Sequence, residues 1–141
     1  MSPLVSVNET IEDTISLTKE EIAQFALLCR DSNPLHFDDA YAASTRFGGI
    51  IACGPQLASI MMGITASHFS RGKAMVGLEF TFKFPAPVRP GDQLALRWEV
   101  TDVQAKPKLE GAIATLAGRA KNQRDEVVIT GIGKVLVVPR L

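Results

Sequence analysis

The sequence predicts an α+β domain, because its hydrophobic pattern changes period once along the chain. Between Thr18 and Ser67 the apolar residues recur at helical spacing, whereas from Ala74 onward apolar and polar residues alternate. The alternating pattern is typical of antiparallel strands that bury one face. Helices followed by a run of strands indicate a helix packed against a sheet. With 141 residues and no internal repeat or linker, we expect one domain, residues 1–141.

The composition argues against several classes of function. Fifteen basic and fifteen acidic residues give a formal net charge of zero, which supports neither nucleic-acid binding nor attraction to an anionic membrane. The most apolar segment, Ile50–Ala66, is short and interrupted by glycine and proline, so it predicts a buried helix and no membrane span. Two cysteines are too few for a disulfide framework, and the first residues lack a signal-peptide pattern. We therefore expect a reduced, cytoplasmic protein.

The first predicted helix begins after a capping box. Thr18 and Glu21 have the spacing at which each side chain can bond the other's backbone amide. The helix should end near Arg30, because Pro34 disfavours helical geometry at Asn33. Its buried face is predicted to contain Ile22, Phe25, Ala26 and Cys29.

Two further helices are predicted before the strands begin. The shorter one covers about residues 38–46, with Asp38 as its N-cap and Gly48–Gly49 as its stop. The longer one begins at Gly54–Pro55, because proline suits the first helical position, and it extends to about Ser67. Apolar residues occupy nearly all its sides, which predicts a helix surrounded by protein.

Four strands are predicted in the second half of the chain. Residues 78–84 and 94–100 alternate strictly, and the turn signal "RPGD" lies between them. Residues 112–121 and 127–138 are also strand-like, and "NQRDE" between them predicts a hairpin loop. This half should therefore form an antiparallel meander that covers the apolar helix.

The loop "CRDSNPLHFDD" carries the residues best suited to chemistry. A histidine can exchange a proton near neutral pH, and a nearby carboxylate can share that work, so Asp31 and His36 are candidates for acid–base catalysis. Asn33 and Pro34 favour a turn that points both side chains at one spot. Residue chemistry leaves two alternatives: Asp31 caps a turn and His36 is a hydrogen-bonded loop residue, or both join the aspartates of "FDD" in a metal site. Because Asp38 and Asp39 suit a helix cap and first turn, no metal is expected.

Three segments together resemble the MaoC-like, (R)-specific enoyl-CoA hydratases. They are "FALLCRDSNPLHFDDAYA", "FGGIIACGPQLAS" and "FKFPAPVRPGDQL", which span roughly residues 18–98 in the order typical of the family. The first contains the hydratase motif, whose matching residues are Phe25, Asp31, Asn33, Pro34, Leu35, His36 and Ala42.

The resemblance implies a hot-dog fold, in which an antiparallel sheet wraps around a long central helix that starts at Gly54. It also implies that Asp31 and His36 hold a water molecule against a trans-2-enoyl thioester and produce an (R)-3-hydroxyacyl thioester. We expect His36 to be the base, although the reverse assignment is open. The Gly54 amide, at the helix N-terminus, should meet the charge on the thioester oxygen. Asn33 and Pro34 should brace the loop.

The chain departs from the family at two places. The family usually has Ser or Thr and then Gly before the catalytic aspartate, whereas this chain has Cys29–Arg30, which could change loop geometry or access. The family often has histidine where this chain has Cys53, a replacement expected to affect contacts with the thioester. Without a nearby partner histidine, we expect Cys53 to be inert and not a nucleophile.

The predicted function is therefore that of a hydratase or dehydratase for acyl thioesters of coenzyme A or acyl-carrier protein. It should need no cofactor and should form a homodimer. One alternative is a non-catalytic subunit that binds acyl thioesters. A hot-dog thioesterase is disfavoured, because that chemistry requires a carboxylate on the central helix and the segment 54–67 has none. Candidate cations for coenzyme A phosphates, by charge alone, are Arg46, Arg71, Lys73 and Arg89.

Overall fold

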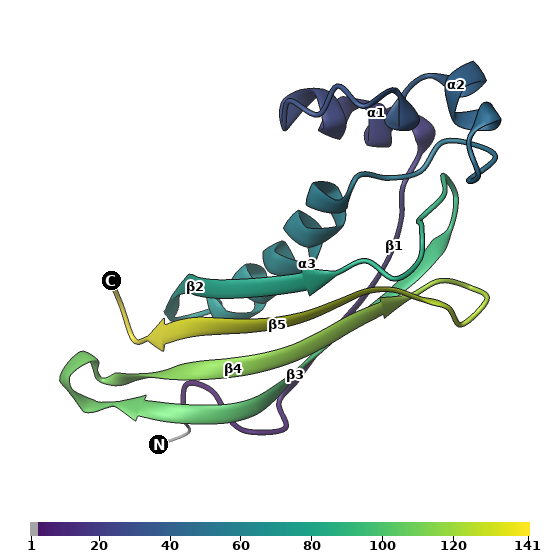
Figure 1. The fold of residues 1–141 in the computed structure, drawn as a ribbon. Helices are drawn as coiled ribbons and strands as arrows, with labels where there is room; N and C mark the ends of the chain where they lie inside the picture. The colour runs from purple at the N-terminus through teal and green to yellow at the C-terminus, as the bar shows by residue number, and fades with distance from the viewer. Residues whose placement is uncertain (1–2) are drawn as a thin grey trace.

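A five-stranded antiparallel sheet curves around one long helix in the computed structural model, which describes residues 3–141 (Figure 1). The strands are β1 (Thr10–Ser16), β2 (Ala74–Lys83), β3 (Gln93–Lys106), β4 (Gly111–Lys121) and β5 (Val127–Val138), in the sheet order β1-β3-β4-β5-β2. The helices are α1 (Lys19–Leu28), α2 (Asp39–Ser44) and α3 (Gly54–Phe69), with short 3-10 turns η1 (Pro34–His36) and η2 (Pro107–Leu109). The predicted α+β class and the hot-dog arrangement are confirmed.

Strand β1 is the element that the sequence did not predict. It pairs with β3 from Thr10 opposite Glu99 to Ser16 opposite Gln93. Only Ile11 on this edge strand is buried, and charged residues stand between its apolar ones. Its position therefore depends on pairing with a distant strand more than on its own pattern.

Helix α1 begins as predicted and ends in a way that corrects the prediction for Cys29. The capping box is present, with the Thr18 hydroxyl accepting from the Glu21 amide at 3.0 Å and the Glu21 carboxylate accepting from the Thr18 amide at 3.0 Å. Ile22 is buried, but Cys29 is exposed. The reason is that the helix ends at Leu28, so helical spacing no longer decides where the next side chain points.

The residue after the C-cap of α1 has a left-handed backbone. Arg30 has φ = +64°, and its N–H donates to the Leu27 carbonyl at 3.2 Å. The Asp31 N–H donates to the Ala26 carbonyl at 2.8 Å, so the two bonds form a Schellman ending. Glycine usually occupies this position because it has no Cβ. The chain thus turns directly out of α1 into the loop that carries Asp31.

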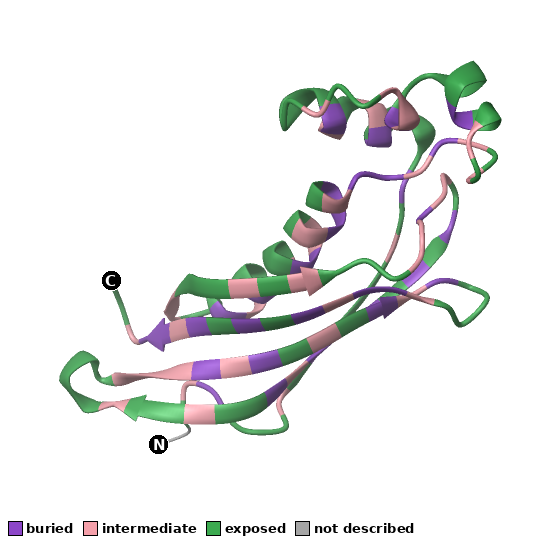
Figure 2. Ribbon diagram, in the orientation of Figure 1, coloured by how far each residue is buried: buried purple, intermediate pink, exposed green. Residues whose placement is uncertain are grey.

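Helix α3 lies on the concave side of the sheet and is not enclosed on all sides, contrary to the prediction. Leu57, Met61 and Phe69 are buried on the side that faces the sheet. The opposite side is exposed and contains Pro55, Ser59, Met62, Gly63, Ala66 and Ser67 (Figure 2). The helix is fixed to the sheet by Trp98 of β3, whose indole N–H donates to the Met61 carbonyl at 2.9 Å.

Three aromatic rings fill the space between the sheet and α3. Phe80 and Phe82 of β2 stack with centroids 5.9 Å apart, and both meet Trp98 edge to face. A Cβ on Gly131 would lie only 2.7 Å from the Phe82 ring. The strand positions beneath these rings are three glycines, namely Gly118, Gly131 and Gly133.

The strict alternation predicted for residues 78–84 is interrupted. Pairing of β2 with β5 shifts between Gly77 and Glu79, which places Leu78 in a bulge where its side chain is half exposed. Phe84, beyond the end of β2, is also 48% exposed. Nε2 of His68 lies 2.6 Å from the Glu9 carboxylate. Among the described residues, no helix has the length and apolar character needed to cross a membrane.

Candidate active site

The loop after α1 is braced by its own hydrogen bonds. The Asp31 carboxylate accepts from the Asn33 amide at 3.0 Å through Oδ1, and the Asn33 side chain accepts from the Leu35 amide at 3.1 Å. Pro34 begins the turn η1, which brings His36 back toward Asp31. Asn33 and Pro34 therefore have the contacts that a bracing role requires.

His36 is held in one orientation at the centre of this site. Its residue is only 5% exposed, and Nδ1 lies 2.8 Å from the Ile51 carbonyl oxygen. Because a carbonyl oxygen can only accept, Nδ1 must carry the hydrogen. Nε2 is the remaining nitrogen, and it lies 3.2 Å from Oδ2 of Asp31. The sequence had no signal for the Ile51 carbonyl, since any residue type supplies one.

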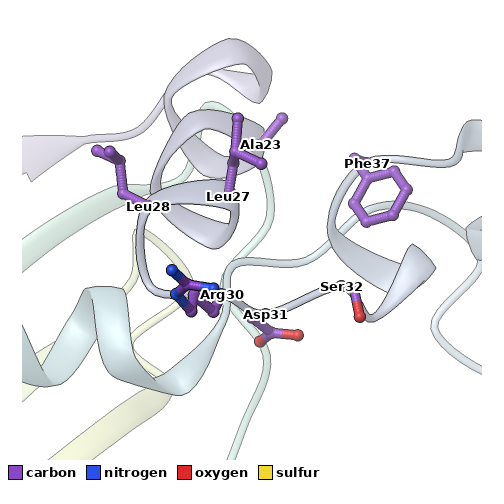
Figure 3. Close-up of a pocket in the computed structure, with 7 residues that line it drawn as sticks. All are labelled: Ala23, Leu27, Leu28, Arg30, Asp31, Ser32 and Phe37. Atoms are coloured by element: carbon purple, nitrogen blue, oxygen red, sulfur yellow. The ribbon is translucent and has the colours of Figure 1, made fainter.

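Two cavities meet the pair from different sides. Cavity A, of about 750 Å³, lies on the Asp31 side and contains Arg30, Leu27, Leu28 and Phe37 among its lining residues. Figure 3 shows Leu27 and Leu28 on one side of the view and Phe37 on the other, with Asp31 below them on the segment that joins the two.

Cavity B, of about 330 Å³, lies on the His36 side of the pair. Its lining includes His36, Gly54 and Leu57, together with Arg46, Phe47 and Phe84. The imidazole and the first residue of α3 therefore line the same cavity.

Gly54 has the position expected of an oxyanion donor. It is the first residue of α3, where backbone N–H groups have no acceptor within the helix. A Cβ at this position would lie 3.2 Å from the nearest atom of the Phe84 ring, so only glycine leaves the helix start uncrowded. The sequence did not assign a role to Phe84, although it lies in one of the segments that resemble the hydratases.

Cys53, which was expected to affect contacts with the thioester, precedes Gly54 and is buried. Its side chain is 1% exposed, and it is not among the residues that line cavity A or cavity B. Burial raises the pKa of the Cys53 thiol, and this effect is partly opposed by a hydrogen bond that the sulfur accepts from the Gln56 backbone N–H. The neighbouring Cys29 thiol and the Asp31 carboxylate raise that pKa further. An uncharged, buried thiol agrees with the expectation that Cys53 is not a nucleophile.

The other acidic residues of the loop have structural contacts. Asp38 caps α2 by accepting from the Tyr41 amide at 3.0 Å, and Asp39 pairs with Lys19. Within residues 3–141 there is no group of three or more His, Cys, Asp or Glu side chains arranged to hold a metal ion.

The four cations proposed for coenzyme A phosphates lie in different places. Arg46 lines cavity B and lies 5.1 Å from the centroid of the Phe47 ring. Arg71 lines a separate groove beside His68, and Lys73 donates to the Leu4 carbonyl. Arg89 also lines neither cavity A nor cavity B, so Arg46 is the one of the four that lines a cavity beside His36 and Asp31.

Comparisons with known proteins identify the family and the fold of this chain. The model of the MaoC-like domain family matches residues 6–119. An (R)-specific enoyl-CoA hydratase from Aeromonas caviae is 38% identical over 112 residues, which cover 79% of this chain and 79% of the relative. Its namesake from Rhodospirillum rubrum is 30% identical over 89% of this chain and 83% of the relative.

Solved structures show the same likeness over nearly the whole chain. The (R)-hydratase from A. caviae involved in PHA biosynthesis superposes with a TM-score of 0.82 at 33% identity, covering 93% of this chain and 96% of that one. An R-hydratase from Pseudomonas aeruginosa in the unliganded form gives 0.83 at 29% identity, covering 96% and 85%. The chain belongs to the MaoC-like domain family, and its fold is the hot-dog fold.

Proposed function

We propose that this protein adds water reversibly to trans-2-enoyl thioesters of coenzyme A or acyl-carrier protein and gives (R)-3-hydroxyacyl thioesters. The observation that carries the proposal is the orientation of His36. Because its Nδ1 hydrogen is bound by the Ile51 carbonyl, its second nitrogen is directed to Asp31, at the boundary between the two cavities. The family and the named activities of the relatives support the same reaction.

The pair of His36 and Asp31 is suited to moving two protons. Nε2 of His36 lies 3.2 Å from Oδ2 of Asp31, so one water molecule can contact both side chains. His36 can take a proton from that water through Nε2, because its Nδ1 already carries a hydrogen. Asp31 holds the same water and passes on the second proton.

Water addition then follows with balanced atoms. His36 Nε2 removes a proton from water, and the oxygen bonds to Cβ of the substrate. The electron pair of the double bond moves toward Cα and the thioester oxygen, where the Gly54 amide meets the developing charge. The proton taken up by His36 is passed on by Asp31 to Cα, so both residues return to their starting state and the elements of one water molecule have been added.

The test is hydration of crotonyl-CoA by the purified protein, followed as loss of the enoyl absorbance. His36→Ala and Asp31→Asn should each lower kcat/KM by about 10²–10⁴-fold, because each removes an acid–base group. His68→Ala and Asp39→Asn are matched controls outside the pair, and they should keep activity. A folded His36→Ala or Asp31→Asn protein with near-normal activity would remove that residue from the mechanism.

The role of Gly54 can be tested separately. Gly54→Ala would place a methyl group against the Phe84 ring and disturb the helix start. If the Gly54 amide meets charge that develops in the transition state, kcat should fall more than KM rises. A weaker KM with kcat intact would leave Gly54 with a role in binding alone.

We also propose that the protein is a cytoplasmic homodimer. Strand β2 is at the edge of the sheet, and its side chains Val76 and Leu78 are exposed. Such an apolar edge is normally paired or covered. Light scattering at micromolar concentration should give the mass of two chains, and Val76→Lys should weaken the association. A wild-type monomer under these conditions would contradict the proposal.

A non-catalytic acyl-thioester-binding subunit is the second candidate. The observation in its favour is the left-handed Arg30, a departure from the family next to Asp31. Binding of crotonyl-CoA without any loss of enoyl absorbance would support this candidate against the hydratase.

A further inference from the structure

Phe84 is an exposed aromatic residue with no role in the reaction described so far. It follows the last residue of β2, and 48% of its surface is exposed even though the side chain is apolar. It lines cavity B together with His36 and Gly54. Three of its ring atoms lie 3.2–3.4 Å from the position that a Cβ on Gly54 would occupy. The ring therefore forms the wall of the cavity beside the proposed oxyanion donor.

The ring is held in place by the backbone on both sides of it. Phe84 continues the alternation of Phe80 and Phe82, whose rings are packed beneath α3. The next residue is proline, which fixes its own backbone angle and favours extended geometry at Phe84. The Val88 carbonyl then accepts from the Ala52 amide at 2.8 Å, so the segment after the ring is bonded to the segment before Gly54. Phe84 and Gly54 thus keep a fixed separation.

The location of the substrate α-carbon follows from the proposed function, on which this inference rests. With the thioester oxygen at the Gly54 amide and Cβ at His36, Cα lies between them in cavity B. The enoyl thioester is conjugated and planar, so a substituent on Cα is held in that plane and cannot rotate away. The wall on the Gly54 side of this space is the Phe84 ring.

We propose that Phe84 is a specificity-determining residue that excludes substituents on the α-carbon. The enzyme accordingly takes enoyl thioesters with hydrogen at Cα and discriminates against 2-methyl-branched ones. An extra methyl group against a rigid wall changes kcat/KM by about 10–200-fold, which sets the size of the effect to be measured.

The experiment compares crotonyl-CoA with its 2-methyl and 3-methyl derivatives on the wild type, Phe84→Ala, Phe84→Tyr and Leu109→Ala. In Phe84→Ala the preference for crotonyl-CoA over the 2-methyl substrate should fall about tenfold or more. Phe84→Tyr keeps the ring and should keep the preference. Leu109, which is 52% exposed in the turn between β3 and β4, is the control for loss of an exposed apolar side chain. The ratio of kcat/KM values for two substrates on one variant cancels any loss of folded protein. Comparing that ratio between variants cancels the different intrinsic reactivities of the substrates.

Two results would overturn the assignment of Phe84. One is a Phe84→Ala protein whose preference equals that of the wild type. The other is an equal gain with the 2-methyl and 3-methyl substrates, since the ring would then limit the cavity generally and not at Cα. A wild type that is inert toward crotonyl-CoA would instead refute the proposed function, so the two failures are distinguishable.

Discussion

Replacing Arg30 with glycine should stabilise the protein, which is unusual for a change beside a candidate active site. Arg30 occupies the left-handed position that ends α1, with φ = +64°. The described structure gives its guanidinium group no ion pair, so the substitution removes no charge interaction seen among residues 3–141. The backbone bonds from Arg30 to Leu27 and from Asp31 to Ala26 can form equally well with glycine.

The size of the gain is the difference between two backbone effects. A residue with a Cβ in the left-handed region costs roughly 1–2 kcal/mol, which glycine relieves. Glycine also gives the unfolded chain more freedom, which costs about 0.4–1 kcal/mol. The free energy of unfolding should therefore rise by roughly 0.5–1 kcal/mol. For a protein of this size, such a gain raises Tm by about 2–4 °C.

Urea titration and thermal denaturation of wild type, Arg30→Gly and Arg30→Ala would measure this gain. Arg30→Ala is the matched control, because alanine removes the guanidinium group but keeps the strained backbone. Arg30→Gly should be more stable than Arg30→Ala, and Arg30→Ala should not exceed the wild type. Equal stability of the two variants would refute the argument from backbone strain.

Three further outcomes are expected. Gly118→Ala should lower the free energy of unfolding by about 1–3 kcal/mol in urea titration, because the new methyl group would overlap the Trp98 ring; an unchanged midpoint would show that the ring can move. Alkylation of the native protein should modify exposed Cys29 before buried Cys53. Labelling of Cys53 should remain slow until the pH exceeds the ordinary thiol range, because its raised pKa keeps the thiol protonated. Equal labelling rates of the two cysteines near neutral pH, measured by mass spectrometry, would contradict this. Hydration of crotonyl-CoA should survive prolonged EDTA treatment and should slow in acid, because protonated His36 cannot accept a proton; an acid limb that persists in His36→Gln at comparable activity would disprove its role as base.

The parts of the fold that local chemistry specifies could be predicted from the sequence. Thr18 and Glu21 specify the start of α1, Asp38 specifies the start of α2, and Gly54–Pro55 specifies the start of α3. In each case a capping side chain or the proline ring acts within one helical turn of its own position. The hairpin loop of residues 122–126 was likewise predicted from its own turn residues.

The parts that depend on distant pairing could not be predicted in this way. Strand β1 has few apolar residues of its own and is fixed by β3, whose paired residues lie 77 to 89 positions later in the chain. The bulge at Leu78 is set by the register between β2 and β5, and neighbouring residues do not reveal it. The exposed side of α3 is also a tertiary property, since the sheet covers only one side of an apolar helix.

The candidate site could likewise be predicted in part from local chemistry, while its other features depend on distant parts of the chain. The turn expected at Asn33 and Pro34 predicted that the side chains of Asp31 and His36 point to one spot, and these side chains lie 3.2 Å apart. The His36 imidazole donates to the backbone carbonyl of Ile51. Because every residue type has this carbonyl, the sequence could not indicate the partner. The place of Phe84 beside Gly54 required the end of β2 to be located in space.

The hydrogen bond from Trp98 to the Met61 carbonyl sets the axial register of α3 against the sheet. Met61 lies about two helical turns, or roughly 10 Å, after Gly54, and an α-helix is stiff over that length. The Trp98 indole therefore fixes how far the N-terminus of α3 extends toward His36, from a position about two helical turns away. The position of α3 relative to the candidate pair, His36 and Asp31, therefore depends on a fully buried side chain of β3.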